Sequence, residues 1–281
     1  MKKMLLFLLI TLSLPQLIKA QSLIITDDTG LVHETLIYDQ FFLETSGDFI
    51  DMALLKQVIR RVQEQVTKEA KNAYFNENNM IMPGTNGQIL DIDLFISKFK
   101  IHFYSKEEAQ INIPMKTVFP RVDEELLAEI SEKRLNSYAT YYNVGHKERT
   151  HNIELATKAI NNHVLFPGEE FSFNQIVGER TKERGYKKAP VIVKGELSEG
   201  IGGGICQVSS TLFNAVNLKG IEIIERYSHS REVPYVPPGQ DATVSWWGPD
   251  FVFKNKYKHP ILIRAQATNG KMQIQIYSSS S

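Results

Sequence analysis

The sequence has a single cysteine, Cys206, among 281 residues. One cysteine cannot pair within its own chain, which excludes an internal disulfide framework. Three uses remain for it: a small hydrophobe buried in the core, half of a bridge to another molecule, or a reactive thiol. The residues around Cys206 have to distinguish between these uses.

The sequence also lacks an excess of either charge, since it has 32 lysines and arginines against 32 aspartates and glutamates. A balanced chain offers no basic surface to a phosphate backbone, so we expect no nucleic-acid partner. Short metal-ligand spacings are missing too, because His146, His151 and His163 are scattered over helix and loop. We therefore expect no metal site, and no motif indicates a cofactor.

Beyond residue 20, no apolar run is long enough to cross a bilayer. The preceding segment, MKKMLLFLLITLSLPQLIKA, begins with Lys2 and Lys3, continues with an apolar stretch and ends in Ala20 at a cleavage position. This is the pattern of a secretory signal peptide, so we expect residues 1–20 to direct export. Without cleavage the segment would remain as a membrane anchor, and we expect no other integral span.

The next part of the chain predicts a small α+β module over residues 49–130, after an N-terminal extension at residues 21–48. One helix begins after Asp51 and keeps apolar residues at helical spacing as far as Ala73. A second helix begins at Asp91, and a half-buried strand follows it. The module lacks a cluster of nucleophilic side chains, so we interpret it as a binding module or a structural arm.

The remaining part, residues 138–281, predicts an α+β domain with an antiparallel sheet, and the boundary before it falls near residues 131–140. A helix begins close to Cys206 and stops before Gly220. The segments with strand character are residues 221–230, 241–247, 251–255, 259–267 and 271–277, with an Asn269-Gly270 hairpin turn before the last.

The local sequence of Cys206, GGGICQVSS, favours a reactive thiol. At the start of a helix, unpaired N–H groups and the positive end of the helix dipole both stabilise a thiolate. Gly203 and Gly204 allow a substrate to approach closely, and the amides of Cys206 and Gln207 could hold an oxyanion. The alternative is that the glycines form only a tight turn and Cys206 faces the core.

A thiol nucleophile needs a base and a group that orients the base. His229 lies in the strand-like segment ERYSHS, and Asp241 opens the segment DATVSWW. Asp250 competes for the orienting role, although an ordinary turn accounts for it. The order cysteine, histidine, aspartate, with the cysteine opening a helix, resembles the papain and transglutaminase-like arrangement. Ser209 and Ser210 lack the G-x-S-x-G elbow of a serine nucleophile.

Substrate-binding candidates are fewer and less specific. Arg226, Arg231 and Lys254 could bind carboxylates, although basic side chains on strands are usually solvated. Trp246 and Trp247 would point to opposite faces of a strand, so that one joins the core and the other, for which we take Trp247, lines a groove.

Four stretches together resemble the VanW-like family: FPGEEFSFNQIVGERT, GYKKAPVIV, GGGICQVSSTLFNA and SHSREVPYVPPGQDATVSWWGPDFVFKN. The resemblance extends over residues 138–265. The segment at residues 49–118 resembles, more loosely, a peptidoglycan-binding module that often precedes such domains. The family takes its name from vancomycin-resistance gene clusters.

The resemblance implies a cell-wall protein, and some VanW domains are implicated as cysteine L,D-transpeptidases of peptidoglycan. The matching residues are Cys206 as nucleophile, His229 as base and Asp241 as orienter. The implied partner is the peptidoglycan stem peptide, and the implied location is the cell wall or the outer face of the cytoplasmic membrane. Hydrolysis of cell-wall peptides by the same thiol, and wall binding without catalysis, remain as alternatives.

Overall fold

The computed structural model describes residues 21–43, 46–105, 107–193 and 196–280, so the expected leader at residues 1–20 lies outside the described residues. The chain divides into two compact units. The N-terminal unit contains the described residues up to Lys71 together with Asn86–Phe119, and the C-terminal unit contains Asn72–Thr85 and the chain from Pro120 onward. Within these ranges no helix is long and apolar enough to cross a membrane.

The N-terminal unit packs two helices on a small mixed sheet of order β2-β1-β8, in which β1 is antiparallel to β2 and parallel to β8. Its helices are α1 (Met52–Val66), α2 (Ile92–Ser105) and the 3₁₀ turn η1 (Tyr38–Phe41). Its strands are β1 (Ser22–Thr26), β2 (Val32–Ile37), β3 (Phe42–Leu43), β4 (Ser46–Ile50), β7 (Gly87–Leu90), β8 (Ala109–Asn112) and β9 (Met115–Val118).

Residues 21–48 are part of this unit rather than an extension before it. Strand β1 is the central strand of the sheet, and its Leu23 and Ile25 have no exposed surface. They pack in one core with Phe95 and Phe99 of α2. The helices cannot bury their apolar faces without these strands, which is why the domain begins earlier than residue 49.

Helix α1 is shorter than its apolar spacing predicts. Asp51 caps its start as expected, accepting from Ala53 N and Leu54 N. The helix ends at Val66, because the Lys68 backbone pairs with Gln88 through two hydrogen bonds of 2.8 Å. A backbone partner in β7 therefore replaces the helical one at Lys68, and Ala73, which the sequence pattern included in the helix, donates instead to Val122 O.

The expected boundary near residues 131–140 lies inside the C-terminal unit. Helix α3 (Glu124–Glu129) packs there with a short hairpin of β5 (Tyr74–Phe75) and β6 (Ile81–Met82). These elements share a small core, in which the buried members are Ala73, Val122, Leu127, Ile130 and Leu262. The module expected over residues 49–130 is thus not one contiguous piece of chain.

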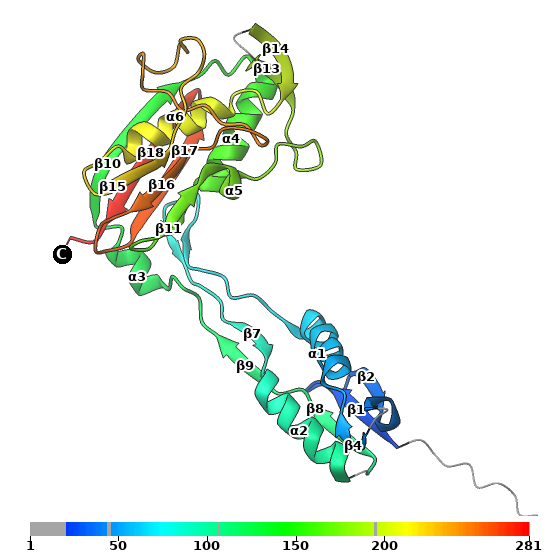
Figure 1. Cartoon of the computed structure of the whole chain (residues 1–281). Coiled ribbons are helices and arrows are strands. Elements are labelled where there is room, and N and C mark those ends of the chain that lie inside the picture. Colours follow the sequence, from blue (N-terminus) through cyan, green and yellow to red (C-terminus); the bar gives the residue numbers. More distant parts are fainter. Residues whose placement is uncertain (1–20, 44–45, 106, 194–195, 281) are drawn as a thin grey trace, which may run out of the picture. The chain divides into compact units, whose positions relative to one another are not determined.

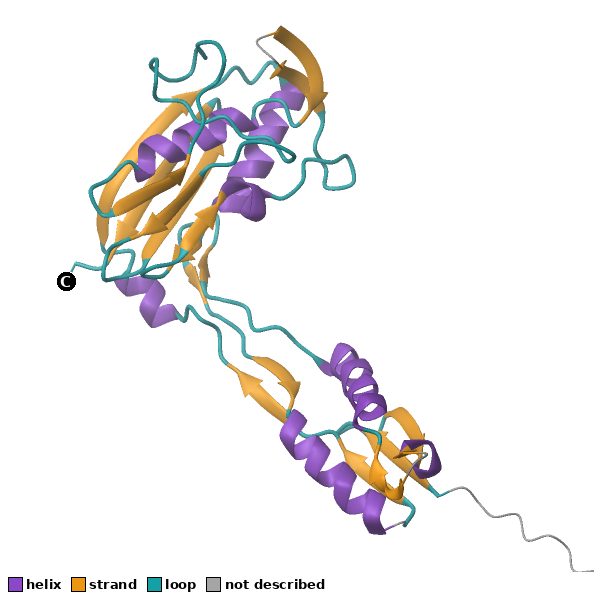
Figure 2. Ribbon diagram, in the orientation of Figure 1, coloured by secondary structure: helices purple, strands orange, loops and turns teal. Residues whose placement is uncertain are grey.

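The C-terminal unit is an α+β domain in which helices cover one antiparallel sheet of order β10-β18-β17-β11 (Figure 1; Figure 2). Helices α4 and α6 pack on this sheet and against each other. A second antiparallel sheet has the order β12-β16-β15, and β13 and β14 form a hairpin. Besides α3, the helices of this unit are α4 (Lys147–Ile160), α5 (Phe173–Val177) and α6 (Ile205–Val216). The strands are β10 (Lys133–Tyr141), β11 (His163–Leu165), β12 (Glu170–Ser172), β13 (Lys188–Val193), β14 (Glu196–Ile201), β15 (Ile221–Glu225), β16 (Val252–Asn255), β17 (Ile261–Thr268) and β18 (Lys271–Ser278).

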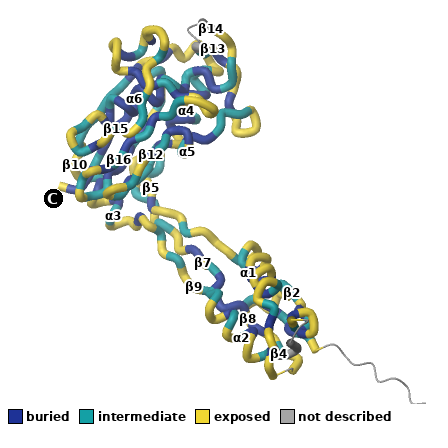
Figure 3. Tube along the Cα trace, in the orientation of Figure 1, coloured by how far each residue is buried: buried dark blue, intermediate teal, exposed yellow. Residues whose placement is uncertain are grey.

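The buried residues of this unit run along the strands of the main sheet and along α6 (Figure 3). Helix α6 ends before Gly220 as predicted, and the Asn269-Gly270 turn joins β17 to β18 with both residues at positive φ. One strand prediction is wrong. Residues 241–247 form only an isolated bridge, Thr243 with Tyr227, and then a turn.

Candidate active site

Helix α6 starts at a turn of glycines, Gly202–Gly204, that packs tightly against neighbouring segments of the chain. A Cβ at Gly203 would lie 2.6 Å from the carbonyl oxygens of both Ala189 and Pro190 in β13. Gly204 caps the helix with φ 106°, and a Cβ there would meet the Arg149 side chain at 2.9 Å. The glycines are therefore required by packing and backbone conformation, so their presence alone does not indicate a substrate.

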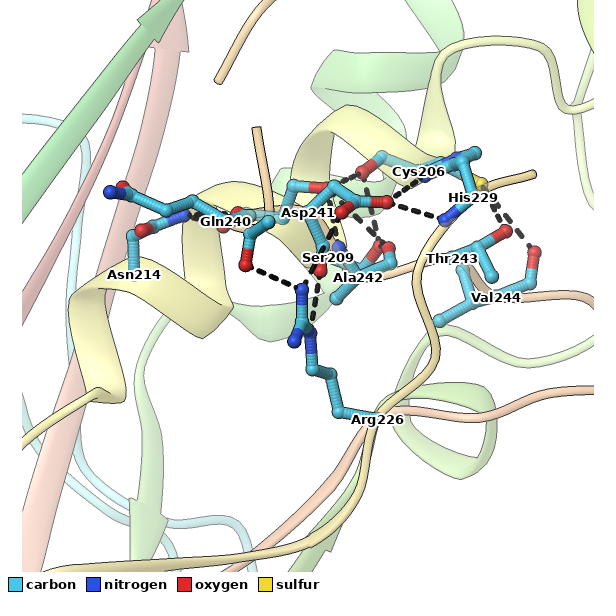
Figure 4. A network of polar contacts seen from close by, with 12 residues as sticks. Cys206, Ser209, Asn214, Arg226, His229, Gln240, Asp241, Ala242, Thr243 and Val244 are labelled. Carbon is cyan, nitrogen blue, oxygen red and sulfur yellow. Dashed lines mark hydrogen bonds and ion pairs between the residues drawn. The ribbon is translucent and has the colours of Figure 1, made fainter. Parts of the chain in front are cut away.

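Cys206 is the second residue of α6 and is partly buried against the main core. Its Sγ lies 3.8 Å from Thr243 Oγ1 and 3.6 Å from Val244 O. These contacts come from the segment after Asp241, so the thiol lies between the start of the helix and that segment (Figure 4).

His229 and Asp241 lie next to this thiol and hold each other. The Asp241 Oδ2 accepts from His229 Nδ1 at 2.5 Å and from the His229 backbone N–H at 2.6 Å. A carboxylate oxygen can only accept, so the proton on Nδ1 follows from this contact. The imidazole lies beside the Cys206 side chain, which gives the order thiol, imidazole, carboxylate (Figure 4).

The three groups favour the charged form of one another. Burial raises the pKa of the Cys206 thiol, but its contacts with His229, with the Val244 backbone and with Thr243, together with the charge of His229, lower it below its usual value. Burial lowers the pKa of His229, whereas its contacts with Cys206 and Asp241 raise it overall. Burial raises the pKa of Asp241, and hydrogen bonds with His229 lower it overall. The arrangement favours a thiolate–imidazolium pair.

Two serines of α6 hold the segment that carries Asp241. Ser209 Oγ donates to Ala242 O at 2.6 Å, and Ser210 Oγ accepts from Ala242 N at 2.9 Å. Ser210 Oγ also lies 2.7 Å from Cys206 O. Both serines are fully buried, so they position the segment instead of reacting. Because the helix satisfies the Ala242 backbone, this segment does not join a sheet.

Asp250 lies elsewhere and does not reach His229 within the described hydrogen bonds. Its carboxylate accepts from Ser172 Oγ at 2.5 Å, from Asn174 N at 2.9 Å and from Phe251 N at 2.7 Å. The carboxylate beside the imidazole is therefore that of Asp241.

Arg226 holds the backbone around Asp241. Its Nε donates to Asp241 O at 2.7 Å, its Nη2 donates to Gly239 O at 2.8 Å, and its guanidinium stacks on Phe213 at 4.6 Å from the ring centre. These contacts occupy the side chain that the sequence suggested for a substrate carboxylate.

The two amides suggested for an oxyanion differ in their contacts. Gln207 N donates to Gly204 O at 3.1 Å, whereas no backbone acceptor for Cys206 N occurs among the described residues. The buried Gln207 side chain bonds Thr140 Oγ1 and accepts from Arg149 Nη2 at 2.7 Å. Gln207 thus ties α6 to its neighbours, and the Cys206 N–H remains for an oxyanion.

The other candidates lie farther from the thiol or have different partners. Arg231 helps to line a cavity of about 180 Å³ that borders His229 and Asp241, and Cys206 is not among its lining residues. Trp247 is 89% exposed on a turn and contacts Trp246 edge to face at 6.2 Å. Lys254 pairs with Glu170 at 3.1 Å.

The histidines considered for a metal lie apart. His151 bonds Gly185 O, His163 packs edge to face on Phe171, and His146 precedes α4 without a side-chain cap bond. Within the described ranges no cluster of three or more potential ligands could hold a metal ion.

Three residues near the thiol carry no signal in the sequence: Arg149 of α4, Arg180 after α5 and Tyr235. Arg149 packs against Gly204 and donates to Gln207, and Arg180 packs against Gly202, so both arginines lie beside the turn that starts α6. Burial is the main cause of the shifts in the pKa values of all three residues, downward for the arginines and upward for Tyr235. They come from segments 26 to 57 residues away from Cys206 in the sequence. Spacing along the chain therefore could not reveal them.

Comparison with known proteins matches residues 148–277 to the model of the family described as VanW like protein. The chain is also 50% identical over 275 residues to the uncharacterized protein YoaR of Bacillus subtilis (strain 168), covering 98% of this chain and 89% of that protein. The chain belongs to the VanW-like family.

Another relative is the vancomycin B-type resistance protein VanW of Enterococcus faecalis (strain ATCC 700802 / V583). It is 35% identical over 104 residues, which is 35% of this chain and 38% of that protein. No solved structure matches the chain, so the papain and transglutaminase-like arrangement is not confirmed by a structural neighbour.

Proposed function

We propose that this VanW-like protein is an exported cysteine L,D-transpeptidase that acts on peptidoglycan stem peptides. The observation that carries the proposal is the partly buried thiol of Cys206, which lies at the start of α6 beside the His229–Asp241 pair. A nucleophile, a base and an orienting carboxylate are the groups that acyl transfer through a thioester requires. The peptide substrate and the export are carried over from the family and the leader pattern.

In the first half-reaction, the Cys206 thiolate attacks the carbonyl carbon of the third residue of a tetrapeptide stem. The carbon–sulfur bond forms, and the oxyanion accepts from the Cys206 N–H. The bond to the terminal D-alanine then breaks, and the His229 imidazolium gives its proton to the leaving amine. Asp241 stabilises the imidazolium until this proton transfer and keeps the ring oriented afterwards.

In the second half-reaction, the side-chain amine of another stem attacks the thioester. Neutral His229 takes the proton of that amine, the carbon–sulfur bond breaks, and the thiolate is restored with a new amide cross-link. If water replaces the amine, the same steps give a carboxypeptidase or endopeptidase.

The N-terminal unit is proposed to bind or reach the wall, with the protein held at the cell wall or the outer face of the membrane. Its own folded core supports a separate module. Binding to purified peptidoglycan, compared between the full chain and a variant without the N-terminal unit, tests this part. Equal retention of both proteins would contradict it.

The catalytic proposal is tested by incubating the full chain with disaccharide tetrapeptides and analysing protein and products by mass spectrometry. We expect an acyl adduct on Cys206, loss of D-alanine and formation of cross-linked dimers. The Cys206→Ala variant should give neither adduct nor dimer, and His229→Gln should form the adduct much more slowly. The exposed His146 serves as the matched control, and His146→Gln should behave as the parent.

An adduct accompanied only by trimmed monomers would point to hydrolysis. Absence of adduct and product, with the fold intact by circular dichroism, would contradict the enzyme and favour a non-catalytic wall-binding protein.

A further inference from the structure

Arg180 follows helix α5 and packs beside the glycine turn that starts α6. A Cβ at Gly202 would lie 3.0 Å from Arg180 Cβ and 3.0 Å from Ile205 Cδ1, so the side chain leaves the backbone next to the turn. The guanidinium carbon lies 5.7 Å from the centre of the Phe173 ring. Arg180 is therefore placed by packing on both sides.

The terminal nitrogens of Arg180 are buried hydrogen-bond donors that lack acceptors among the described residues. Both Nη1 and Nη2 are buried, and neither has a hydrogen-bond partner among the residues that the structure describes. A buried cation without partners is unfavourable, and folded proteins rarely leave such groups unpaired. Burial lowers the pKa of Arg180, but a guanidinium keeps its charge. Something outside the protein is expected to supply acceptors to these nitrogens.

The surroundings of Arg180 favour an external anion as its partner, close to the sulfur of Cys206. Arg180 packs against Gly202, in the turn that leads into α6 and Cys206, and the charges of Tyr186, Cys206 and Asp250 raise its pKa. Asp250 does not pair with it, because that carboxylate accepts from Ser172, Asn174 and Phe251. The nearby Arg184 adds a second positive charge.

We propose that the Arg180 guanidinium binds a carboxylate of the acyl donor next to the bond that Cys206 attacks. This rests on the proposed acyl transfer, and it narrows the donor to an anionic peptide. The planar fork of arginine matches the two oxygens of a carboxylate and would satisfy both orphaned nitrogens at once. Two carboxylates could occupy the site: that of the third stem residue's side chain and the terminal one of the leaving residue.

The test compares Arg180→Gln and Arg180→Lys with the parent on three donors. One tetrapeptide has both carboxylates free, and the other two are amidated at the side-chain or the terminal position. A hydrogen bond to a charged group contributes about 10- to 100-fold in affinity. We expect Arg180→Gln to lower kcat/KM by that factor on the tetrapeptide with both carboxylates free. On the donor in which the carboxylate that Arg180 binds is amidated, the kcat/KM of Arg180→Gln should equal that of the parent. The amide that removes the effect identifies the carboxylate.

Arg184→Gln is the matched control, since it removes the same charge from a residue whose Nη2 donates only to Val177 O among the described contacts. It should reduce kcat/KM slightly and without preference between the donors. Equal losses on charged and amidated donors in Arg180→Gln would overturn the proposal. A changed pH profile of Cys206 alkylation in Arg180→Gln, without altered donor preference, would also overturn it and assign Arg180 to the thiolate.

A binding measurement separates this proposal from the catalytic one. The thermal midpoint of the parent should rise with N-acetyl-D-alanine or with an N-acetylated diamino acid, and not with the corresponding amide, whether or not an adduct ever forms. Arg180→Gln should lose this response and should itself be at least as stable as the parent, because an uncompensated buried charge has been removed. If Arg180→Gln is less stable than the parent, or if its thermal midpoint still rises with the acids, Arg180 has only a structural role.

Discussion

Asp241 Oδ2 accepts two hydrogen bonds from the same residue, at 2.5 Å from His229 Nδ1 and at 2.6 Å from the His229 backbone N–H. The bond to the backbone N–H fixes the position of the chain at His229, and the bond to Nδ1 fixes the orientation of the imidazole ring. With Nδ1 engaged by Asp241, the other ring nitrogen remains for the Cys206 side chain. One carboxylate thus sets the tautomer that a base for Cys206 requires.

Asp241→Asn is expected to lower kcat/KM by about 10²- to 10⁴-fold, since the amide cannot stabilise the imidazolium and can present a donor to Nδ1. The measurement is the rate of acyl-adduct formation on Cys206. Asp250→Asn is a contrasting variant, whose effect should appear in stability because Asp250 holds Ser172 and Asn174. A larger catalytic loss in Asp250→Asn would contradict the assignment of Asp241.

The alkylation rate of Cys206 by iodoacetamide should rise with a midpoint below pH 9.0, the ordinary value of its pKa, because His229 favours the thiolate. In His229→Gln, burial acts without this compensation, so the midpoint should move to higher pH. His146→Gln should match the parent. A thiol that iodoacetamide labels only after unfolding would show that Cys206 is a buried hydrophobe.

The His229–Asp241 pair should also give stability a defined pH dependence. The folded-state pKa of Asp241 is below 3.8, so its contribution is present above that pH and is lost as the pH falls through the folded value. The folded-state pKa of His229 is above 6.5, so its contribution is complete below that pH and is lost as the pH rises through the folded value. Chemical unfolding between about pH 3 and about pH 9 should therefore show a flatter profile for Asp241→Asn than for the parent.

Ser210→Ala should lower the free energy of unfolding by about 1–3 kcal/mol, because it leaves the buried Ala242 N–H without its acceptor. It should also slow acylation, since Ala242 follows Asp241 directly. Ser131→Ala provides the control, because Ser131 Oγ donates only at the exposed end of α3, and its effect should stay within about 0.5 kcal/mol. Loss of stability with unchanged acylation would contradict the positioning role of Ser210.

Gly203→Ala should destabilise the protein by about 1–3 kcal/mol, because the new methyl group would overlap two carbonyl oxygens of β13 at 2.6 Å. At the exposed Gly145, an added Cβ would meet only the flexible Asn143 side chain at 3.0 Å. Gly145→Ala should therefore change stability by less than about 0.5 kcal/mol. Stability is measured by thermal or denaturant unfolding. If Gly203→Ala and Gly145→Ala change it equally, β13 moves away from the turn to make room for the methyl group.

Local signals in the sequence determined the features of this protein that depend on neighbours along the chain. The Asp51 cap, the start of α6 close to Cys206 and the Asn269-Gly270 hairpin all follow from residues within a few positions of one another. Such signals are reliable because capping and turn geometry are settled by backbone conformation and short-range hydrogen bonds.

The tertiary structure alone decided how distant segments complete one another. It made residues 21–48 part of the N-terminal core, since β1 fills the centre of a sheet that α2 covers. It kept the segment after Asp241 out of the sheet, because two serines of α6 satisfy the Ala242 backbone. It also buried the terminal nitrogens of Arg180 beside the turn that leads into Cys206, where they have no hydrogen-bond partner among the described residues. Periodicity along the chain cannot reveal these contacts, because the energy of burying a surface or pairing a charge depends on residues that meet only after folding.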